Sequence, residues 1–159
     1  MSSLHPPPAI VLQQVGGAEL DSVMAIMVDA FDDRFGEAWT RPQCAGILPM
    51  HGVVLTLALD DTVPLGFSLV RSVAGESELL LLAVHPRGRR RSVGTALVKR
   101  FVEDARKAGA HYLHLEVRDG NPATALYDRS GFRLVGRRSN YYRGTDGETF
   151  DALTMAKTL

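Results

Sequence analysis

The chain has 159 residues, with 18 basic and 18 acidic side chains, so its formal net charge at pH 7 is +0. Its hydrophobic content of 45% is enough for a buried core, and its length is typical of one domain. The neutral balance argues against a protein that binds nucleic acid or anionic membranes through general charge, so we expect neither as a partner.

The same composition bears on the compartment. The single cysteine, Cys44, excludes an internal disulfide framework. The start of the chain lacks a basic segment followed by an apolar one, as a secretory signal requires. The longest apolar run, residues 79–84, is too short to span a bilayer. We therefore expect a cytoplasmic protein.

The first third of the chain predicts one strand and two helices. Residues 1–9 include three prolines and are expected to form a loose lead-in. Residues 10–15 read as a strand, which two glycines end. Residues 18–31 place apolar side chains at helical spacing, and residues 41–48 predict a second, short helix after a polar loop.

The middle of the chain predicts a meander and a long helix. Residues 53–59 and 65–72 flank a turn at Asp60 and Asp61, which predicts an antiparallel pair, and residues 78–84 supply the next strand. A helix then begins near Val93. Its apolar face contains Leu97, Val98, Phe101, Val102 and Ala105, and Gly109 is placed to end it.

The last third predicts a strand, a short helix and two final strands. Residues 111–118 alternate between apolar and polar side chains. Asn121 is expected to cap a helix whose first residue is Pro122. Residues 132–135 and 151–155 complete the sheet. The order of elements is typical of a mixed α/β fold, with a largely antiparallel sheet crossed by helices.

An anion site is the most specific chemical feature. The apolar strand is followed by Pro86, by four arginines in five positions (87, 89, 90 and 91), and by a small-residue turn that opens the helix. Backbone N–H groups at a helix N-terminus and arginine side chains both suit phosphate oxygens. A Walker loop is excluded because no Gly-Lys-Ser/Thr follows, and the three-glycine spacing of a dinucleotide fold is missing. A solvated arginine run is the alternative.

Two further residues are candidates for acid–base chemistry. Glu116 lies near the end of a strand whose other face is apolar, where it is either a surface carboxylate or a general base beside the anion site. Tyr127 lies on the short helix, where it is either a packed core residue or an acid. A phenol with a pKa near 10 suits the return of a proton to a thiolate.

Other candidates carry weaker signals. We expect Cys44 to be packed core, and the histidines show no metal-ligand spacing, so no metal is expected. His114 shares a strand face with Glu116. Tyr141 and Tyr142 form an aromatic cluster with nearby arginines, which is either an ordinary hairpin or a substrate-binding lip.

Four segments carry a family resemblance: ELLLLAVHPRGRRRSVGTAL, LHLEVRDGN, ALYDRSGF and RRSNYYRGTDGETFDALTM. With them the chain resembles the GNAT acetyltransferases, and within that superfamily the RimI-type ribosomal-protein-alanine N-acetyltransferases. The resemblance implies an α/β (α+β) GNAT-like fold with a mixed, mostly antiparallel, twisted sheet of about seven strands flanked by four helices. It also implies a single acetyltransferase domain over residues 10–159, after a flexible lead-in at residues 1–9.

The resemblance assigns roles to residues. It implies acetyl-CoA as co-substrate, Glu116 as base and Tyr127 as acid, with Tyr141, Tyr142 and His114 binding the acceptor. It implies that the cofactor is bound by Leu82, Ala83, Val84, Arg89, Arg90, Arg91, Ser92, Val93, Gly94, Thr95 and Asn121.

Two departures from the family pattern stand out. Ser92 replaces the first glycine of the usual loop, which carries a conformational cost if that position needs a positive φ. The spacing from Asn121 to Tyr127 is one residue shorter than usual, and one residue turns a helical side chain by roughly 100°.

The implied function is transfer of an acetyl group to a primary amine by direct attack in a ternary complex. The expected acceptor is the N-terminal α-amine of a protein such as a ribosomal protein. The alternatives are a small-molecule amine (a polyamine, an amino acid or a drug) and a non-catalytic CoA-binding module. A monomer and a homodimer both remain open.

Overall fold

A computed structural model describes residues 9–159, so the expected lead-in at residues 1–9 lies, apart from Ala9, outside the described residues. The described chain forms one seven-stranded sheet with the strand order β1-β2-β3-β4-β5-β7-β6. The strands are β1 (Ile10–Val15), β2 (Val53–Asp60), β3 (Val63–Val73), β4 (Glu76–Val84), β5 (Tyr112–Arg118), β6 (Arg133–Arg143) and β7 (Thr149–Thr158).

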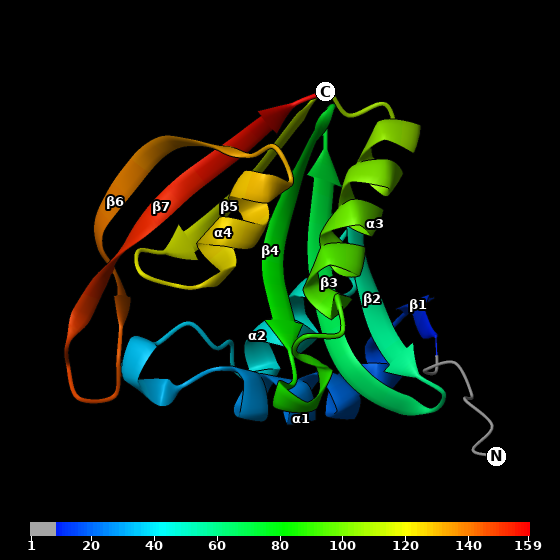
Figure 1. The fold of residues 1–159 in the computed structure, drawn as a ribbon, viewed down its shortest axis with the longest axis horizontal. Helices are drawn as coiled ribbons and strands as arrows, with labels where there is room; N and C mark the ends of the chain where they lie inside the picture. Colours follow the sequence, from blue (N-terminus) through cyan, green and yellow to red (C-terminus); the bar gives the residue numbers. More distant parts are fainter. Residues whose placement is uncertain (1–8) are drawn as a thin grey trace, which may run out of the picture.

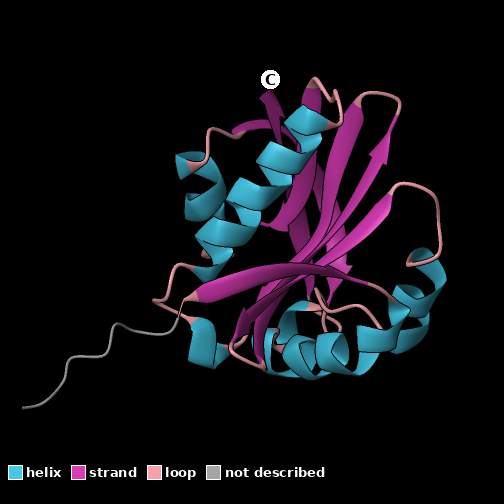
Figure 2. Ribbon diagram, turned by 90° about the vertical axis from the view of Figure 1, so that its right-hand side faces the viewer, coloured by secondary structure: helices cyan, strands magenta, loops and turns pink. Residues whose placement is uncertain are grey.

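The helices cover both faces of this sheet (Figures 1 and 2). The helices are α1 (Leu20–Ala30), α2 (Arg41–Ile47), α3 (Val93–Lys107) and α4 (Ala123–Arg129). Helices α1 and α2 pack on one face and α3 and α4 on the other, each with its own buried cluster. The expected mixed fold with seven strands and four helices is therefore confirmed.

Each face has its own core. Beneath α3 and α4, buried side chains such as Phe101, Leu115 and Phe132 pack together. Beneath α1 and α2, a second cluster includes Met27, Cys44 and Phe67. Cys44 is buried as expected. Burial of this apolar area on both faces fixes the sheet between two layers of helices.

The junction of β4 and β5 is the irregular part of the sheet. Among the described strands, β4 and β5 pair in parallel, whereas the other neighbouring strands pair antiparallel. The pairing of β4 with β5 ends where Leu79 lies opposite Leu115. On the other side of β4, the pairing with β3 skips Leu80, which marks a β-bulge. Bulges bend a strand and often lie next to active sites. Figure 1 shows β4 and β5 diverging beyond this point, which leaves that edge of β4 without a neighbouring strand.

Two of the differences from the predicted element boundaries bear on the pocket described below. Strand β6 runs through Tyr141 and Tyr142, whereas the sequence predicted a strand only at residues 132–135. Helix α4 begins at Ala123, with Pro122 in the cap position expected of Asn121. The Asn121 side chain nevertheless accepts a hydrogen bond from the Ala123 N–H at 2.8 Å, so it provides the expected capping contact.

No helix of the described chain is long and apolar enough to cross a membrane.

Candidate active site

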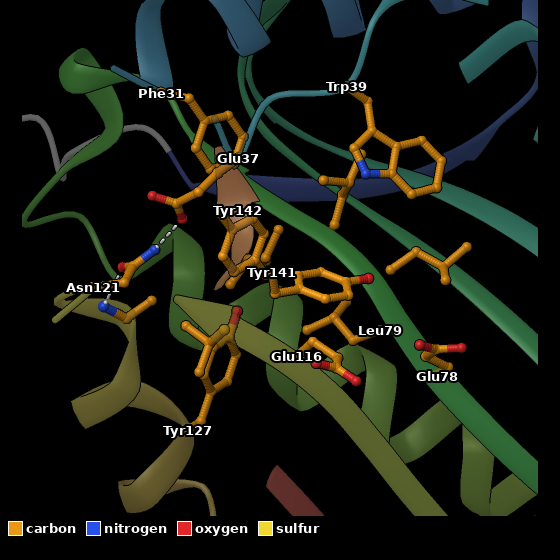
Figure 3. Close-up of a pocket in the computed structure, with 15 residues that line it drawn as sticks. Phe31, Glu37, Trp39, Glu78, Leu79, Glu116, Asn121, Tyr127, Tyr141 and Tyr142 are labelled. Carbon is orange, nitrogen blue, oxygen red and sulfur yellow. Dashed lines mark hydrogen bonds between the residues drawn. The ribbon is translucent and has the colours of Figure 1, made fainter. Parts of the chain in front are cut away.

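A pocket of about 140 Å³ opens where β4 and β5 diverge (Figure 3). Its walls come from both strands, from the loop between α1 and α2, from α4 and from β6. The lining includes three carboxylates, at Glu37, Glu78 and Glu116. Tyrosines 127, 141 and 142 also line it, so this pocket brings together residues that are far apart in the sequence.

Glu116 has one paired and one unpaired carboxylate oxygen. Its side chain is 16% exposed, and Oε1 lies 2.8 Å from Nε of Arg138 on β6. Among the described residues, Oε2 is the buried side-chain oxygen or nitrogen that has no hydrogen-bond partner. A buried oxygen of this kind costs free energy unless something binds it. Glu116 can therefore accept a proton or a hydrogen bond from a molecule in the pocket.

Tyr127 extends from α4 into the same pocket (Figure 3). The side chain is almost fully buried and packs edge-on against Phe132, so the core interpretation of the sequence is confirmed, and the same side chain also lines the pocket. Burial raises the pKa of its phenol, with smaller contributions from Tyr142 and Glu37. The hydroxyl therefore stays protonated at neutral pH and can act as a hydrogen donor.

Glu37 is a pocket residue that sequence reasoning missed. Its carboxylate joins the α1–α2 loop to the turn between β5 and α4. Oε1 accepts from Nε of Arg118 at 2.6 Å, and Oε2 accepts from Nδ2 of Asn121 at 2.7 Å. The Arg118 guanidinium also stacks on the Phe35 ring, 3.7 Å from its centre. The one sequence feature that could have pointed to Glu37 is Arg118, a charged residue at the end of a strand with apolar alternation, which needs an acidic partner if it is buried.

The predicted acceptor-binding residues divide into two groups. Tyr141 and Tyr142 line the pocket from β6, with their rings edge-to-face and centres 4.9 Å apart. Burial raises the pKa of Tyr142 as well. His114 does not line the pocket. It lies two residues earlier on β5, with its ring tilted against that of Tyr112 and its Nε2 4.0 Å from Glu76, so the structure does not place it in the pocket.

The predicted anion loop joins the free edge of β4 to the start of α3. Leu82, Ala83 and Val84 form the end of β4 beyond its pairing with β5. The first intrahelical bond of α3 runs from the Ala96 N–H to the Ser92 carbonyl at 3.0 Å. The N–H groups of Val93, Gly94 and Thr95 precede it, and such groups at a helix start are available to an anion.

The loop itself has an unusual backbone. Ser92 has φ +59° and Arg90 has φ +63°, both in the left-handed region that favours glycine. The position where the family pattern has glycine does therefore need a positive φ. The Ser92 side chain makes no capping hydrogen bond that would compensate.

The side chains of this loop do not all face a ligand. Arg91 donates to Asp60 on β2 at 2.8 Å, and the Val93 side chain is fully buried against β2 and β3. These two residues can offer backbone groups, whereas Arg89 and Arg90 lie in the exposed part of the loop. A Cβ at Gly94 would lie 3.1 Å from Leu126 on α4, so the absence of a side chain there lets the two helices approach.

With this geometry in place, the relationship to known proteins is clear. Residues 20–132 match the sequence profile described as "Acetyltransferase (GNAT) family", and the chain belongs to that family.

The chain is similar to the [ribosomal protein bS18]-alanine N-acetyltransferase of Escherichia coli. The two are 40% identical over 91 residues, which is 57% of this chain and 61% of that protein. The match thus spans less than two thirds of the curated relative.

Two solved structures extend the comparison. The crystal structure of the E. coli ribosomal-protein-S18-alanine N-acetyltransferase superposes with a TM-score of 0.84, at 27% identity, over 94% of each chain. Arabidopsis thaliana NAA60 in complex with acetyl-CoA gives a TM-score of 0.81 over 95% of this chain and 99% of that one. At 19% identity, the second shows a shared fold alone.

The described residues fit the diphosphate and the amide-rich arm of acetyl-CoA. The free edge of β4 offers backbone groups, and the start of α3 offers N–H groups. Within residues 9–159, no group of three or more His, Cys, Asp or Glu side chains is arranged so that it could hold a metal ion.

Proposed function

We propose that this protein transfers an acetyl group from acetyl-CoA to a primary amine, and that the acceptor is the N-terminal α-amine of a protein. The observation that carries the proposal is the unpartnered, buried Oε2 of Glu116 in a pocket that it shares with Tyr127. A base and an acid on two walls of one pocket are what amide formation from a thioester requires.

The cofactor site is proposed from the anion loop. Leu82, Ala83 and Val84 hold the pantetheine arm through their backbone, and residues 89–95 hold the diphosphate. When bound, acetyl-CoA supplies an electrophilic carbonyl carbon and a thiolate leaving group. Asn121 differs from the other residues predicted to bind the cofactor, because both ends of its side-chain amide are already hydrogen-bonded, to Glu37 and to Ala123.

The chain's own groups then handle the protons. An α-amine has a pKa near 8, so it reaches the pocket largely as an ammonium ion at neutral pH. Glu116 Oε2 takes the proton that must be removed before attack. Tyr127, whose pKa is raised by burial, keeps its proton until the thiolate leaves. Positioning of the two reactants supplies further acceleration.

Two observations support a protein N-terminus as acceptor. Tyr141, which lines the pocket from β6, is 52% exposed, so the pocket reaches the protein surface there. The E. coli relatives carry names that state this activity for those proteins.

The test is direct acetylation. Purified protein would be incubated with acetyl-CoA and either a peptide that begins with alanine or the same peptide with a blocked N-terminus. Parallel reactions would contain spermidine, free alanine and an aminoglycoside. We expect mass spectrometry to find one acetyl group on the free peptide only. Modification of a small amine with no reaction of the peptide would favour the small-molecule alternative, and binding of CoA without turnover would favour the non-catalytic module.

A further inference from the structure

Glu78 is a second carboxylate in the same pocket, and the role assignments above do not use it. It lies on β4, two residues before the bulge at Leu80, whereas Glu116 lies on β5. Register places Glu78 opposite His114, on the same strand face as Glu116. Both carboxylates line the pocket, as Figure 3 shows.

The charged groups around Glu78 leave its charge uncompensated within the described residues. Arg71 is its neighbour on β3 and is exposed, and His114 is its neighbour on β5. Neither side chain forms an ion pair with Glu78 within residues 9–159. His114 lies 4.0 Å from the carboxylate of Glu76 instead. On the β6 side, Arg138 pairs with Glu116.

The third carboxylate of the pocket differs in this respect. Glu37 is held on both oxygens by Arg118 and Asn121, and its negative charge is already paired with the Arg118 guanidinium. Among the described residues, one carboxylate oxygen of Glu116 and both of Glu78 have no hydrogen-bond or ion-pair partner in the protein. The pocket therefore has an end with more negative than positive charge, while the chain as a whole is neutral.

We propose that Glu78 determines which form of the acceptor the enzyme binds: it is the counter-ion that draws the protonated amine into the pocket, beside Glu116. This inference rests on the proposed function. An ammonium between two carboxylates can give one N–H proton to Glu116 Oε2 while Glu78 stays ionised. The neutral amine then forms the new C–N bond as the C–S bond breaks, and Tyr127 gives its proton to the sulfur. The nitrogen loses its second proton on becoming an amide, and that proton restores the Tyr127 hydroxyl. The proton on Glu116 returns to solvent.

A division of labour between the two carboxylates follows. Glu116 moves a proton, so its loss lowers kcat. Glu78 attracts a cation, so its loss raises KM for the acceptor at a pH where the amine is charged. Acceptors with a cationic amine are thereby favoured over neutral nucleophiles of the same size.

The test compares Glu78→Gln with Glu76→Gln. Glu76 lies on the same strand, is 55% exposed and does not line the pocket, so it is the matched control. At about pH 7 we expect Glu78→Gln to raise the KM for an alanine-starting peptide about tenfold, with kcat within about twofold of wild type. Above about pH 9 the amine is neutral, and the difference in KM should shrink to about twofold or less.

A neutral mimic provides a second readout. A peptide with an aminooxy group in place of the N-terminal amine is uncharged at neutral pH, and its inhibition constant should be equal for wild type and Glu78→Gln. A KM for Glu78→Gln equal to that of the control would overturn the inference, as would a pH-independent defect in kcat. These results differ from failure of the proposed function, in which the wild-type protein acetylates no peptide amine at all.

Discussion

The Arg118 guanidinium and the Glu37 carboxylate form a buried ion pair, with Nε 2.6 Å from Oε1 and side-chain exposures of 9% and 11%. Arg118 ends strand β5 and Glu37 belongs to the loop between α1 and α2. The pair thus fixes the loop between α1 and α2 to the strand that carries Glu116. Phe35 and Asn121 complete the contact, one by stacking and the other by a hydrogen bond.

Loss of one partner of this pair should be costly. Arg118→Met leaves a buried carboxylate with one hydrogen bond, and we expect the free energy of unfolding to fall by about 3 kcal/mol. The control is Arg41→Met, which removes an exposed pair with Asp21 and should cost less than about 1 kcal/mol. Urea denaturation measures both.

The double variant, Arg118→Met with Glu37→Met, removes the stranded charge. It should therefore be more stable than Arg118→Met alone. If the free energy of unfolding of Arg118→Met lies within about 1 kcal/mol of the wild-type value, the pair does not hold the loop.

Ser92 provides a test of backbone strain at the anion loop. Because its φ is +59° and its side chain makes no capping hydrogen bond, Ser92→Gly should raise the free energy of unfolding by about 1 kcal/mol. Ser92→Ala keeps the strain and should bring no such gain. Equal stability of the glycine and alanine variants would mean that the loop does not hold this conformation in solution.

The buried phenol of Tyr127 predicts a specific alkaline behaviour. Its pKa is raised in the folded protein above the unfolded value near 10, so the proton is bound more tightly in the folded state. The contribution of the protonated phenol to the free energy of unfolding is therefore fully present below about pH 10 and is lost as the pH rises above that value. Thermal melts should therefore show a steeper loss of stability in this range for wild type than for Tyr127→Phe.

Tyr127→Phe also separates catalysis from binding. The hydroxyl is proposed to protonate the leaving thiolate, so its removal should lower kcat by about 100-fold and leave the dissociation constant of acetyl-CoA unchanged. Calorimetry and steady-state kinetics on one preparation give both numbers. A variant with full turnover would remove Tyr127 from the mechanism.

Much of the fold followed from the periodicity of the sequence. The strand at residues 10–15 and the helix from Val93, with Gly109 beyond its end, appear where they were predicted, because apolar spacing and a left-handed glycine leave few alternatives. The length of β6 was missed because its exposed side chains show no alternation. Its pairing with β7, which continues to the Arg143–Thr149 pair, decides its extent instead.

The site was predictable only in part for a similar reason. Glu116 and Tyr127 lie in motifs, and the structure places both in one pocket. Glu37 lies in an irregular loop, and its role depends on Arg118, which is 81 positions away in the chain. The bulge at Leu80 has no glycine or proline to mark it, so the opening between β4 and β5 could not be read from an apparently uniform run of leucines.

The proposal that Glu116 takes the acceptor's proton is tested most directly by Glu116→Gln. The measurement is kcat/KM for an alanine-starting peptide, determined beside the affinity for acetyl-CoA. Because the amide cannot accept the proton, we expect kcat/KM at neutral pH to fall at least about 100-fold while acetyl-CoA binds as in wild type. A Glu116→Gln protein that acetylates the peptide at the wild-type rate would contradict the proposed mechanism.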